Sequence, residues 1–278
     1  MEKITPLYRK IIGNVLFKLK EKGEIDIDEL TNLKAKKDEI IPIIKNVLES
    51  TNIIKIEGDK LILNTNLDSQ KNILLLSSFT SISVSEKGDR SFKTVKEITP
   101  IDQTDKIEHT IHKIDYPYSS KVVRCSNPKI FDPLTLGKVK GSCKKLQEGK
   151  LIKFYINFTP PLKVGQFAKY RYSTWEKEYF GLTISDIEKK YGIDYSYEGV
   201  AVVFPTHYVR IKINLPWIPS YANAFQTMRI PSEEGSDRLA FNLIKGVNYR
   251  FHNEENTLIL ELFNPPMGEY GIKWKPPK

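Results

Sequence analysis

Two segments of this chain share one pattern of glycine, phenylalanine and proline. The interval from Gly141 to Phe158 equals the interval from Gly246 to Phe263, and a Pro-Pro pair follows each phenylalanine after one intervening residue. A further glycine and then an alternation of aromatic or apolar with basic residues follow in both copies. The sequence therefore predicts a duplicated scaffold over about two thirds of the chain, and such a scaffold constrains the fold more than it indicates a chemistry.

The composition is that of a globular protein with a sizeable core. The 278 residues are 40% hydrophobic, which suffices for two or three domains. No apolar run approaches the roughly 18 residues of a membrane helix, and charged residues interrupt the N-terminal segment too often for a secretory signal. The two cysteines, Cys125 and Cys143, are too few for a disulfide framework. We therefore expect a cytoplasmic protein without a membrane segment.

The first sixty-odd residues have a helical pattern followed by a hairpin. Apolar residues recur at three- and four-residue steps from Leu7 to Leu19, which predicts an amphipathic helix that ends near Gly23. A short second helix and a third helix over residues 38–50 follow. Two strands around Gly58 complete the segment as a β-hairpin.

Three helices followed by a hairpin resemble a winged helix-turn-helix domain, here over about residues 4–65. The resemblance implies DNA binding through the third helix. The candidate contacts are the lysines of the turn, the third helix and the wing: Lys34, Lys36, Lys37, Lys45, Lys55 and Lys60. The outward face of the third helix carries three acids and one base and would repel phosphate. A protein contact or dimerisation therefore stays open beside DNA binding.

From Lys71 onward, strands and turns replace the helical pattern. Apolar residues alternate in residues 152–158 and 209–215, which predicts strands with one buried face. The offset between the two copies is about the length of one immunoglobulin-sized β-sandwich, and each copy resembles such a sandwich. We predict a multidomain protein, with a small α+β winged-helix head followed by two all-β immunoglobulin-like sandwich repeats. The predicted domains are residues 1–66, 70–175 and 176–278, and no specific family is identified.

The second copy contains two features that interrupt the strand pattern. A helical insertion is predicted over residues 184–190, with Thr183 or Ser185 as its N-cap. Residues 217–236 form the longest segment without periodicity, and long loops in compact domains are often functional. The aromatic residues of this predicted loop are therefore candidate contacts: Trp217, Tyr221 and Phe225.

Most of the excess positive charge lies in one stretch. The chain has a net charge of +9, and residues 121–153 hold nine basic residues against two acidic ones. The corresponding residues 226–258 of the second copy hold four basic and five acidic residues, so the charge is specific to the first copy. Six lysines are candidate contacts to an acidic partner, either nucleic acid or protein: Lys138, Lys140, Lys144, Lys145, Lys150 and Lys153. A solubilising face, or an edge strand protected by lysines, is the structural alternative.

The sequence contains no recognised catalytic or cofactor motif. The Gly-x-Ser-x-Gly, His-Glu-x-x-His, Walker and dinucleotide glycine patterns are all missing. His109 and His112, with Cys125 and Cys143, lack the spacing of a zinc finger, and on a strand the two histidines would point to opposite faces. His207 is expected to be a surface residue. We therefore predict no catalytic residue, metal or cofactor.

These features together predict a cytoplasmic, non-enzymatic binding or regulatory protein. In this interpretation the winged-helix head and the sandwiches are interaction modules, and the first sandwich carries a basic surface for an acidic partner. One alternative is a DNA-binding transcription regulator whose β repeats sense a ligand or dimerise. Another alternative is an enzyme whose site has no motif. The oligomeric state stays open.

Overall fold

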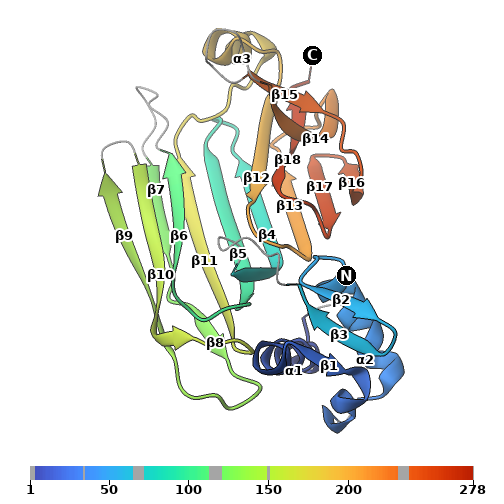
Figure 1. The fold of residues 1–278 in the computed structure, drawn as a ribbon. Helices are drawn as coiled ribbons and strands as arrows, with labels where there is room; N and C mark the ends of the chain where they lie inside the picture. The colour runs from blue at the N-terminus through green and yellow to red at the C-terminus, as the bar shows by residue number, and fades with distance from the viewer. Residues whose placement is uncertain are drawn as a thin grey trace.

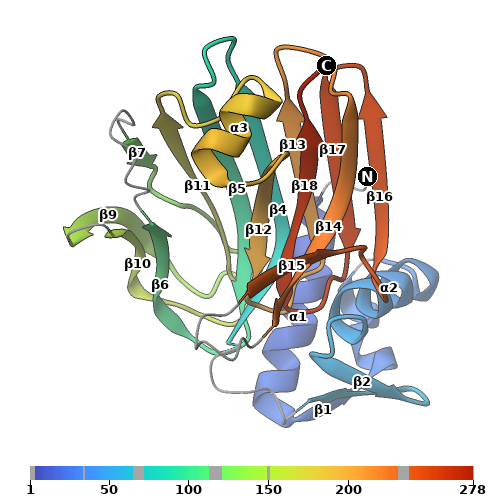
Figure 2. The same ribbon diagram turned by 90° about the horizontal axis from the view of Figure 1, so that it is seen from above.

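The computed structural model describes residues 4–33, 35–64, 72–112, 121–148, 151–230 and 238–277. An N-terminal unit of short helices and a small sheet lies at one end of a β region in which three larger sheets pack together (Figure 1, Figure 2). The elements of the N-terminal unit are helix α1 (Pro6–Lys22), strand β1 (Glu24–Asp26), the 3-10 segment η1 (Ile27–Leu33), helix α2 (Lys37–Ile44), the π-helical segment η2 (Lys45–Glu49), strand β2 (Ile54–Glu57) and strand β3 (Lys60–Leu63).

Local sequence accounts for both ends of α1. Thr5 is the N-cap, and its side-chain oxygen accepts a hydrogen bond from the Tyr8 amide at 3.2 Å. Pro6 occupies the first turn, where a helix does not need an amide donor. Gly23 ends the helix with a φ of 79°, a conformation that favours glycine.

The N-terminal unit shares its core with the β region. Its apolar side chains form one cluster with five residues from beyond residue 72: Leu74, Leu76, Ile101, Val164 and Phe167. Helix α1 also approaches the β region very closely, because a Cβ atom on Gly13 would lie 2.8 Å from the carbonyl oxygen of Gly165. The unit is therefore packed as part of a larger body.

The prediction of a winged-helix head over residues 4–65 is wrong. The second predicted helix is the 3-10 segment η1, and the third is the eight-residue α2 prolonged by η2. The protein is mainly β, and the described N-terminal residues do not close a core by themselves. Periodicity in the sequence detected the helical turns, but it could not show that distant strands complete their apolar face.

The β region is built from strands of 3 to 12 residues and one helix. The strands are β4 (Ile73–Val84), β5 (Arg90–Pro100), β6 (Thr104–His112), β7 (Lys121–Cys125), β8 (Lys129–Phe131), β9 (Lys140–Glu148), β10 (Leu151–Leu162), β11 (Phe167–Glu176), β12 (Ser196–Val202), β13 (Tyr208–Asn214), β14 (Tyr221–Ile230), β15 (Arg238–Asn242), β16 (Asn248–Glu254), β17 (Thr257–Phe263) and β18 (Gly268–Lys275). Helix α3 (Ile184–Tyr191) is capped by Thr183, as the sequence predicts. Among the described helices, none is long and apolar enough to cross a membrane.

One eight-stranded sheet forms the centre of the β region. Its strand order is β16-β17-β13-β4-β5-β11-β7, with β8 also paired to β11. Strands β13 and β4 are parallel, whereas the other neighbours are antiparallel. The three-stranded sheet β6-β10-β9 and the four-stranded sheet β12-β18-β14-β15 flank this central sheet.

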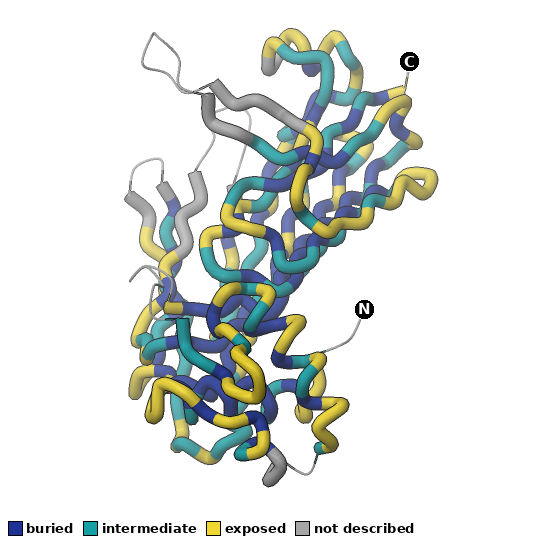
Figure 3. Tube along the Cα trace, turned by 45° about the vertical axis from the view of Figure 1, so that its right-hand side comes forward, coloured by how far each residue is buried: buried dark blue, intermediate teal, exposed yellow. Residues whose placement is uncertain are grey.

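Both flanking sheets pack against the same face of the central sheet. Ile98 of β5 belongs to one hydrophobic cluster with Phe154 of β10, and Ile211 of β13 belongs to another with Trp274 of β18. Figure 3 shows buried positions concentrated along these strands and at the junction with the N-terminal unit. We call this side of the central sheet the covered face and the opposite side, to which Lys93 of β5 points, the open face.

The prediction of two separate immunoglobulin-like sandwiches is also wrong, although the β region does contain packed sheets. Strands β4 and β13, from different predicted repeats, pair directly within one continuous sheet. The two halves share a strand order nonetheless: β5-β11-β7 and β6-β10-β9 in the first half correspond to β12-β18-β14 and β13-β17-β16 in the second. The predicted boundaries, 1–66, 70–175 and 176–278, stay a prediction.

Candidate functional site

A cavity of about 560 Å³ lies where the N-terminal unit meets the open face of the central sheet. We call it the junction cavity. Its lining comes from α1, η2 and strands β4, β5, β11, β13, β16 and β17. The volume lies within the range of small-molecule binding sites.

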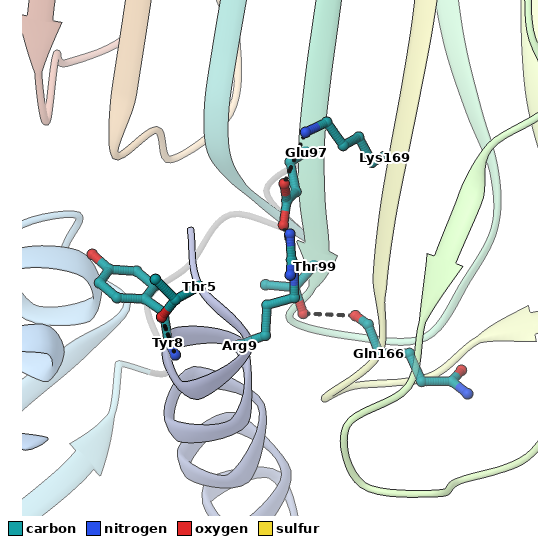
Figure 4. Close-up of polar contacts among 7 residues, drawn as sticks. All are labelled: Thr5, Tyr8, Arg9, Glu97, Thr99, Gln166 and Lys169. Atoms are coloured by element: carbon teal, nitrogen blue, oxygen red, sulfur yellow. Dashed lines mark hydrogen bonds and ion pairs between the residues drawn. The ribbon is translucent and has the colours of Figure 1, made fainter. Parts of the chain in front are cut away.

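Cross-strand register brings polar residues together in the wall of this cavity. Ser77 of β4 pairs with Glu97 of β5, and Glu97 pairs with Lys169 of β11. Partners in register point to the same face, so these three side chains lie side by side on the open face. Arg9 reaches Glu97 from the first turn of α1, as Figure 4 shows.

The centre of the site is a carboxylate held by two cations. The Arg9 Nε lies 2.7 Å from Glu97 Oε1, and the Lys169 Nζ lies 3.8 Å from Glu97 Oε2 (Figure 4). The Glu97 side chain is 2% exposed and that of Arg9 is 12% exposed, whereas Lys169 is 43% exposed. The Arg9 guanidinium also stacks on the ring of Phe131 at 4.2 Å. Two cations against one carboxylate leave a surplus of positive charge in the wall.

A histidine with two partners lies across the cavity. His207 Nδ1 is 2.9 Å from Asn264 Oδ1, and His207 Nε2 is 3.3 Å from the Tyr8 hydroxyl. These contacts fix the orientation of the imidazole, whose proton positions depend on its tautomer. The expectation of a surface histidine missed both partners, because they come from α1 and from the end of β17.

Aromatic rings form the apolar wall of the junction cavity. Tyr208 lies 5.6 Å from Phe79 and 5.5 Å from Phe263, measured between ring centroids. The Tyr208 hydroxyl donates a short hydrogen bond to Glu261. Burial, together with this bond, raises the pKa of Tyr208 above its ordinary value, so the hydroxyl stays protonated and keeps its role as donor.

The arrangement suits recognition of an anion with an apolar body. The terminal amino groups of Arg9 have no hydrogen bond with the described residues, so they are available to an anionic oxygen. Within the described part of the chain, no group of three or more His, Cys, Asp or Glu residues could hold a metal ion.

The lysines predicted in the basic stretch do not share one face. Lys144 pairs in register with Tyr155, whereas Lys145 pairs with the fully buried Phe154, so the two side chains point to opposite sides of their sheet. Lys153 lies 3.9 Å from Glu108. Lys138 and Lys140 are exposed, and Lys150 lies outside the described residues. Contact of this stretch with an acidic partner stays a prediction.

The lysines predicted as winged-helix contacts are partly engaged by acids of their own unit. Lys37 lies 2.9 Å from Asp28, and Lys60 lies 2.9 Å from Glu24. Three further lysines of this set are exposed: Lys36, Lys45 and Lys55. Lys34 lies outside the described residues.

The predicted aromatic loop is largely a strand. Residues Tyr221–Ile230 form β14, which pairs directly with β18 in the four-stranded sheet. Phe225 is fully buried and Trp217 packs against the core of that sheet, whereas Tyr221 is 42% exposed. Two of the three aromatic side chains therefore have a packing role.

The two cysteines form a disulfide that their number did not predict. It joins Cys125 of β7 to Cys143 of β9, and so links the edge of the central sheet to the edge of a flanking sheet. The side chains of His109 and His112 lie outside what the structure describes.

Comparison with known proteins gives matches only among solved structures. No protein-family model and no curated protein matches the chain. A crystal structure of a proposed protease from Parabacteroides distasonis ATCC 8503 has 9% identity and a TM-score of 0.42, with 74% of this chain and 41% of that chain covered. An M1 zinc metallopeptidase from Deinococcus radiodurans has 10% identity and a TM-score of 0.33, with 74% and 42% covered. Leukotriene A4 hydrolase from Saccharomyces cerevisiae has 12% identity and a TM-score of 0.38, with 75% and 30% covered.

The chain thus spans less than half the length of each of these proteins. The likeness is too low to assign a fold or an activity to the chain. Three predictions are nevertheless corrected. The exclusion of an enzyme does not stand. The interpretation as a non-enzymatic binding or regulatory protein with a winged helix is also wrong, and so is the alternative of a DNA-binding regulator. Both depended on a winged-helix head and two separate sandwiches, which the described fold does not have.

Proposed function

We propose that the junction cavity binds a small organic anion, with its anionic group at Arg9 and Lys169 and its apolar body against Phe79 and Phe263. The observation that carries this proposal is the charge balance at Glu97. This buried carboxylate neutralises only one of the two cations that contact it, and the remaining charge faces the cavity.

The physical chemistry of the site supports an anion over a cation. An ionised ligand group accepts charge-assisted hydrogen bonds from a guanidinium, and these are about twice as strong as bonds between neutral groups. Partial burial strengthens the attraction, because few waters screen the charges of Arg9 and Glu97. The rings of Phe79, Tyr208 and Phe263 supply apolar contact for a ligand body.

Titration calorimetry with three probes of the same shape tests the proposal. Benzoate and phenyl phosphate represent the two common anionic groups, and benzylamine is the cationic counterpart. We expect one or both anions to bind and benzylamine not to bind. The difference between benzoate and phenyl phosphate then shows whether the site takes a carboxylate or a phosphate.

Two lysine variants make this test specific. Lys169→Met removes the more exposed cation of the cavity and should weaken anion binding about tenfold. Lys177→Met removes a comparably exposed lysine, which lies 3.4 Å from Glu178 and outside the cavity lining, and should leave binding unchanged. Benzylamine binding as tightly as benzoate, or equal anion binding by Lys169→Met and the unmodified protein, would overturn the proposal.

A cytoplasmic location is a second, separate proposal. It is supported by the small number of cysteines, whereas the disulfide between Cys125 and Cys143 argues against it. Alkylation of thiols in intact cells tests it, because a reducing compartment keeps both cysteines free. Full protection of both from alkylation would contradict a cytoplasmic location.

A further inference from the structure

Beyond the junction cavity, the open face of the central sheet carries two rows of aligned side chains. The first row runs across the strands in the order Arg250, Glu261, Arg210, Phe79, Val95 and Arg171. The second row runs in the order His252, Ile259, Lys212, Ser81, Lys93, Ser173 and Arg124. Strand pairing therefore assembles one surface from residues far apart in the sequence.

Positive charge dominates these two rows. Six cations belong to them: Arg250, Arg210, Lys212, Lys93, Arg171 and Arg124. Glu261 is their one carboxylate, and it already accepts a hydrogen bond from Tyr208. Within the described residues, none of the six cations forms an ion pair. The Nε of Arg210 is moreover buried without a hydrogen-bond partner there. These charges are compensated by solvent ions or by a partner.

Small hydroxyl residues separate the cations and leave them accessible. In the second row, Ser81 lies between Lys212 and Lys93, and Ser173 lies between Lys93 and Arg124. Cations on every second strand are about 10 Å apart. Lys93 and Arg124 are exposed, as is Arg171 in the neighbouring row. At the β7 edge, Arg124, Ser91, Ser173 and Trp175 line a hollow of about 410 Å³.

The side chains between the cations favour carboxylates over nucleic acid as the partner chemistry. Proteins that bind single strands interleave basic residues with aromatic platforms for the bases. The two rows contain one phenyl ring, Phe79, which is half-buried in the wall of the cavity, and Trp175 stands apart at the edge. A broad sheet face also does not fit a duplex groove, which admits a helix or a two-stranded ribbon. Four of the six cations are arginines, whose planar fork matches a carboxylate.

We propose that the open face of the central sheet docks an acidic polypeptide surface, whose Asp and Glu carboxylates pair with the arginines and lysines of the two rows. Charge complementarity carries this inference, and the proposal is independent of the ligand in the junction cavity. The interface is polar, so its affinity falls as the salt concentration rises.

Fluorescence anisotropy with labelled poly-L-glutamate tests the surface in the full chain, at low and at physiological salt. The variant Lys93→Glu/Arg171→Glu/Lys212→Glu reverses three charges of the two rows and should weaken binding about tenfold or more. The control Lys87→Glu/Lys189→Glu/Lys245→Glu makes the same change in net charge at exposed lysines outside the two rows and should bind like the unmodified protein. A thermal melt of each variant shows that both are folded.

Single-stranded DNA of matched charge is the competing probe. Tighter binding of DNA than of polyglutamate would overturn the proposal in favour of a nucleic-acid surface. Equal loss of polyglutamate binding in the two triple variants would also overturn it, because the attraction would then follow net charge alone. We expect the open-face variant, and not the control, to lose polyglutamate binding. We also expect the unmodified protein to bind DNA more weakly than polyglutamate.

Discussion

Each face of the central sheet has an arginine that pairs with a buried carboxylate, but the numbers of cations and carboxylates are reversed between the two faces. On the covered face, Arg90 lies 3.0 Å from Glu176 and 2.6 Å from Glu198, so one cation meets two carboxylates. On the open face, the single carboxylate of Glu97 meets Arg9 and Lys169. Arg90 is thus shared by two carboxylates on one side, whereas Glu97 is shared by two cations on the other.

The surroundings of the two clusters explain what each can do. Arg90 is packed between the rings of Phe92 and Tyr179, at 4.7 and 4.9 Å, and it joins the central sheet to β12 of the four-stranded sheet. Burial by itself would lower the pKa of Arg90, but the charges of Glu198 and Glu176 raise it above its ordinary value. The Arg9 cluster instead borders a cavity. The Arg90 cluster, which protein surrounds, therefore has a structural role. The Arg9 cluster lies beside a cavity and can therefore also contact a ligand.

The free energy of unfolding should fall most when the covered cluster loses its arginine. Arg90→Met removes the cation that contacts both buried carboxylates and should lower the free energy of unfolding by about 3–5 kcal/mol. Urea denaturation measures this loss. The triple variant Arg90→Met/Glu176→Gln/Glu198→Gln should recover much of it, because no buried charge remains. A loss below about 1 kcal/mol in Arg90→Met would show that the cluster does not hold the sheets together.

Removing the arginine of the open cluster should lower the free energy of unfolding by less than removing Arg90 does. Arg9→Met leaves Glu97 with Lys169 as a remaining cation at 3.8 Å. We expect a loss of about 1–3 kcal/mol in the free energy of unfolding, measured by the same urea method. The loss should shrink in a Glu97→Gln background. A loss equal to that of Arg90→Met would mean that the open cluster is as structural as the covered one.

Neither cluster could be predicted from the sequence, whereas much of the local structure could. Alternation correctly predicted the buried faces of β10 and β13, and the cap residue correctly predicted α3. The alternation of apolar and polar residues did not predict β14. Its adjacent residues Ala224 and Phe225 are both buried, so apolar residues do not simply recur at every second position there. Arg9 and Glu97 are 88 residues apart. Only the docking of α1 on the sheet brings them together, and no local pattern encodes that contact.

A lysine without a carboxylate tests the covered face further. Lys96 lies on this face with its Nζ 6.0 Å from the ring of Tyr172, and no described carboxylate pairs with it. Burial lowers the pKa of Lys96 to about 8. Between pH 8 and the ordinary lysine pKa of about 10.4, the unfolded chain binds a proton that the folded chain does not, so rising pH stabilises the folded state.

The variant Lys96→Met should therefore be more stable than the unmodified protein near neutral pH, by roughly 1–3 kcal/mol. The difference should shrink as the pH rises from 8 toward 10. Urea unfolding of both proteins across this range measures the change. Lys93→Met, on the open face of the same strand, serves as the control and should give no such trend. A difference that stays constant with pH would show that the covered face accommodates the charged amine without cost.

The smallest effect on stability is expected at Lys169, where the two clusters differ most in accessibility. Lys169 is 43% exposed and lies 3.8 Å from Glu97, and solvent-screened pairs of this kind contribute about 0–1 kcal/mol. Lys169→Met should therefore change the free energy of unfolding by less than about 1 kcal/mol, as Lys177→Met should. Such a small change would show that the stability of the fold does not depend on the charge of Lys169, so this charge is available to bind an anionic ligand. A loss in the free energy of unfolding close to that of Arg9→Met would instead show that Lys169 stabilises the fold. The surplus positive charge of the open cluster would then have a structural role.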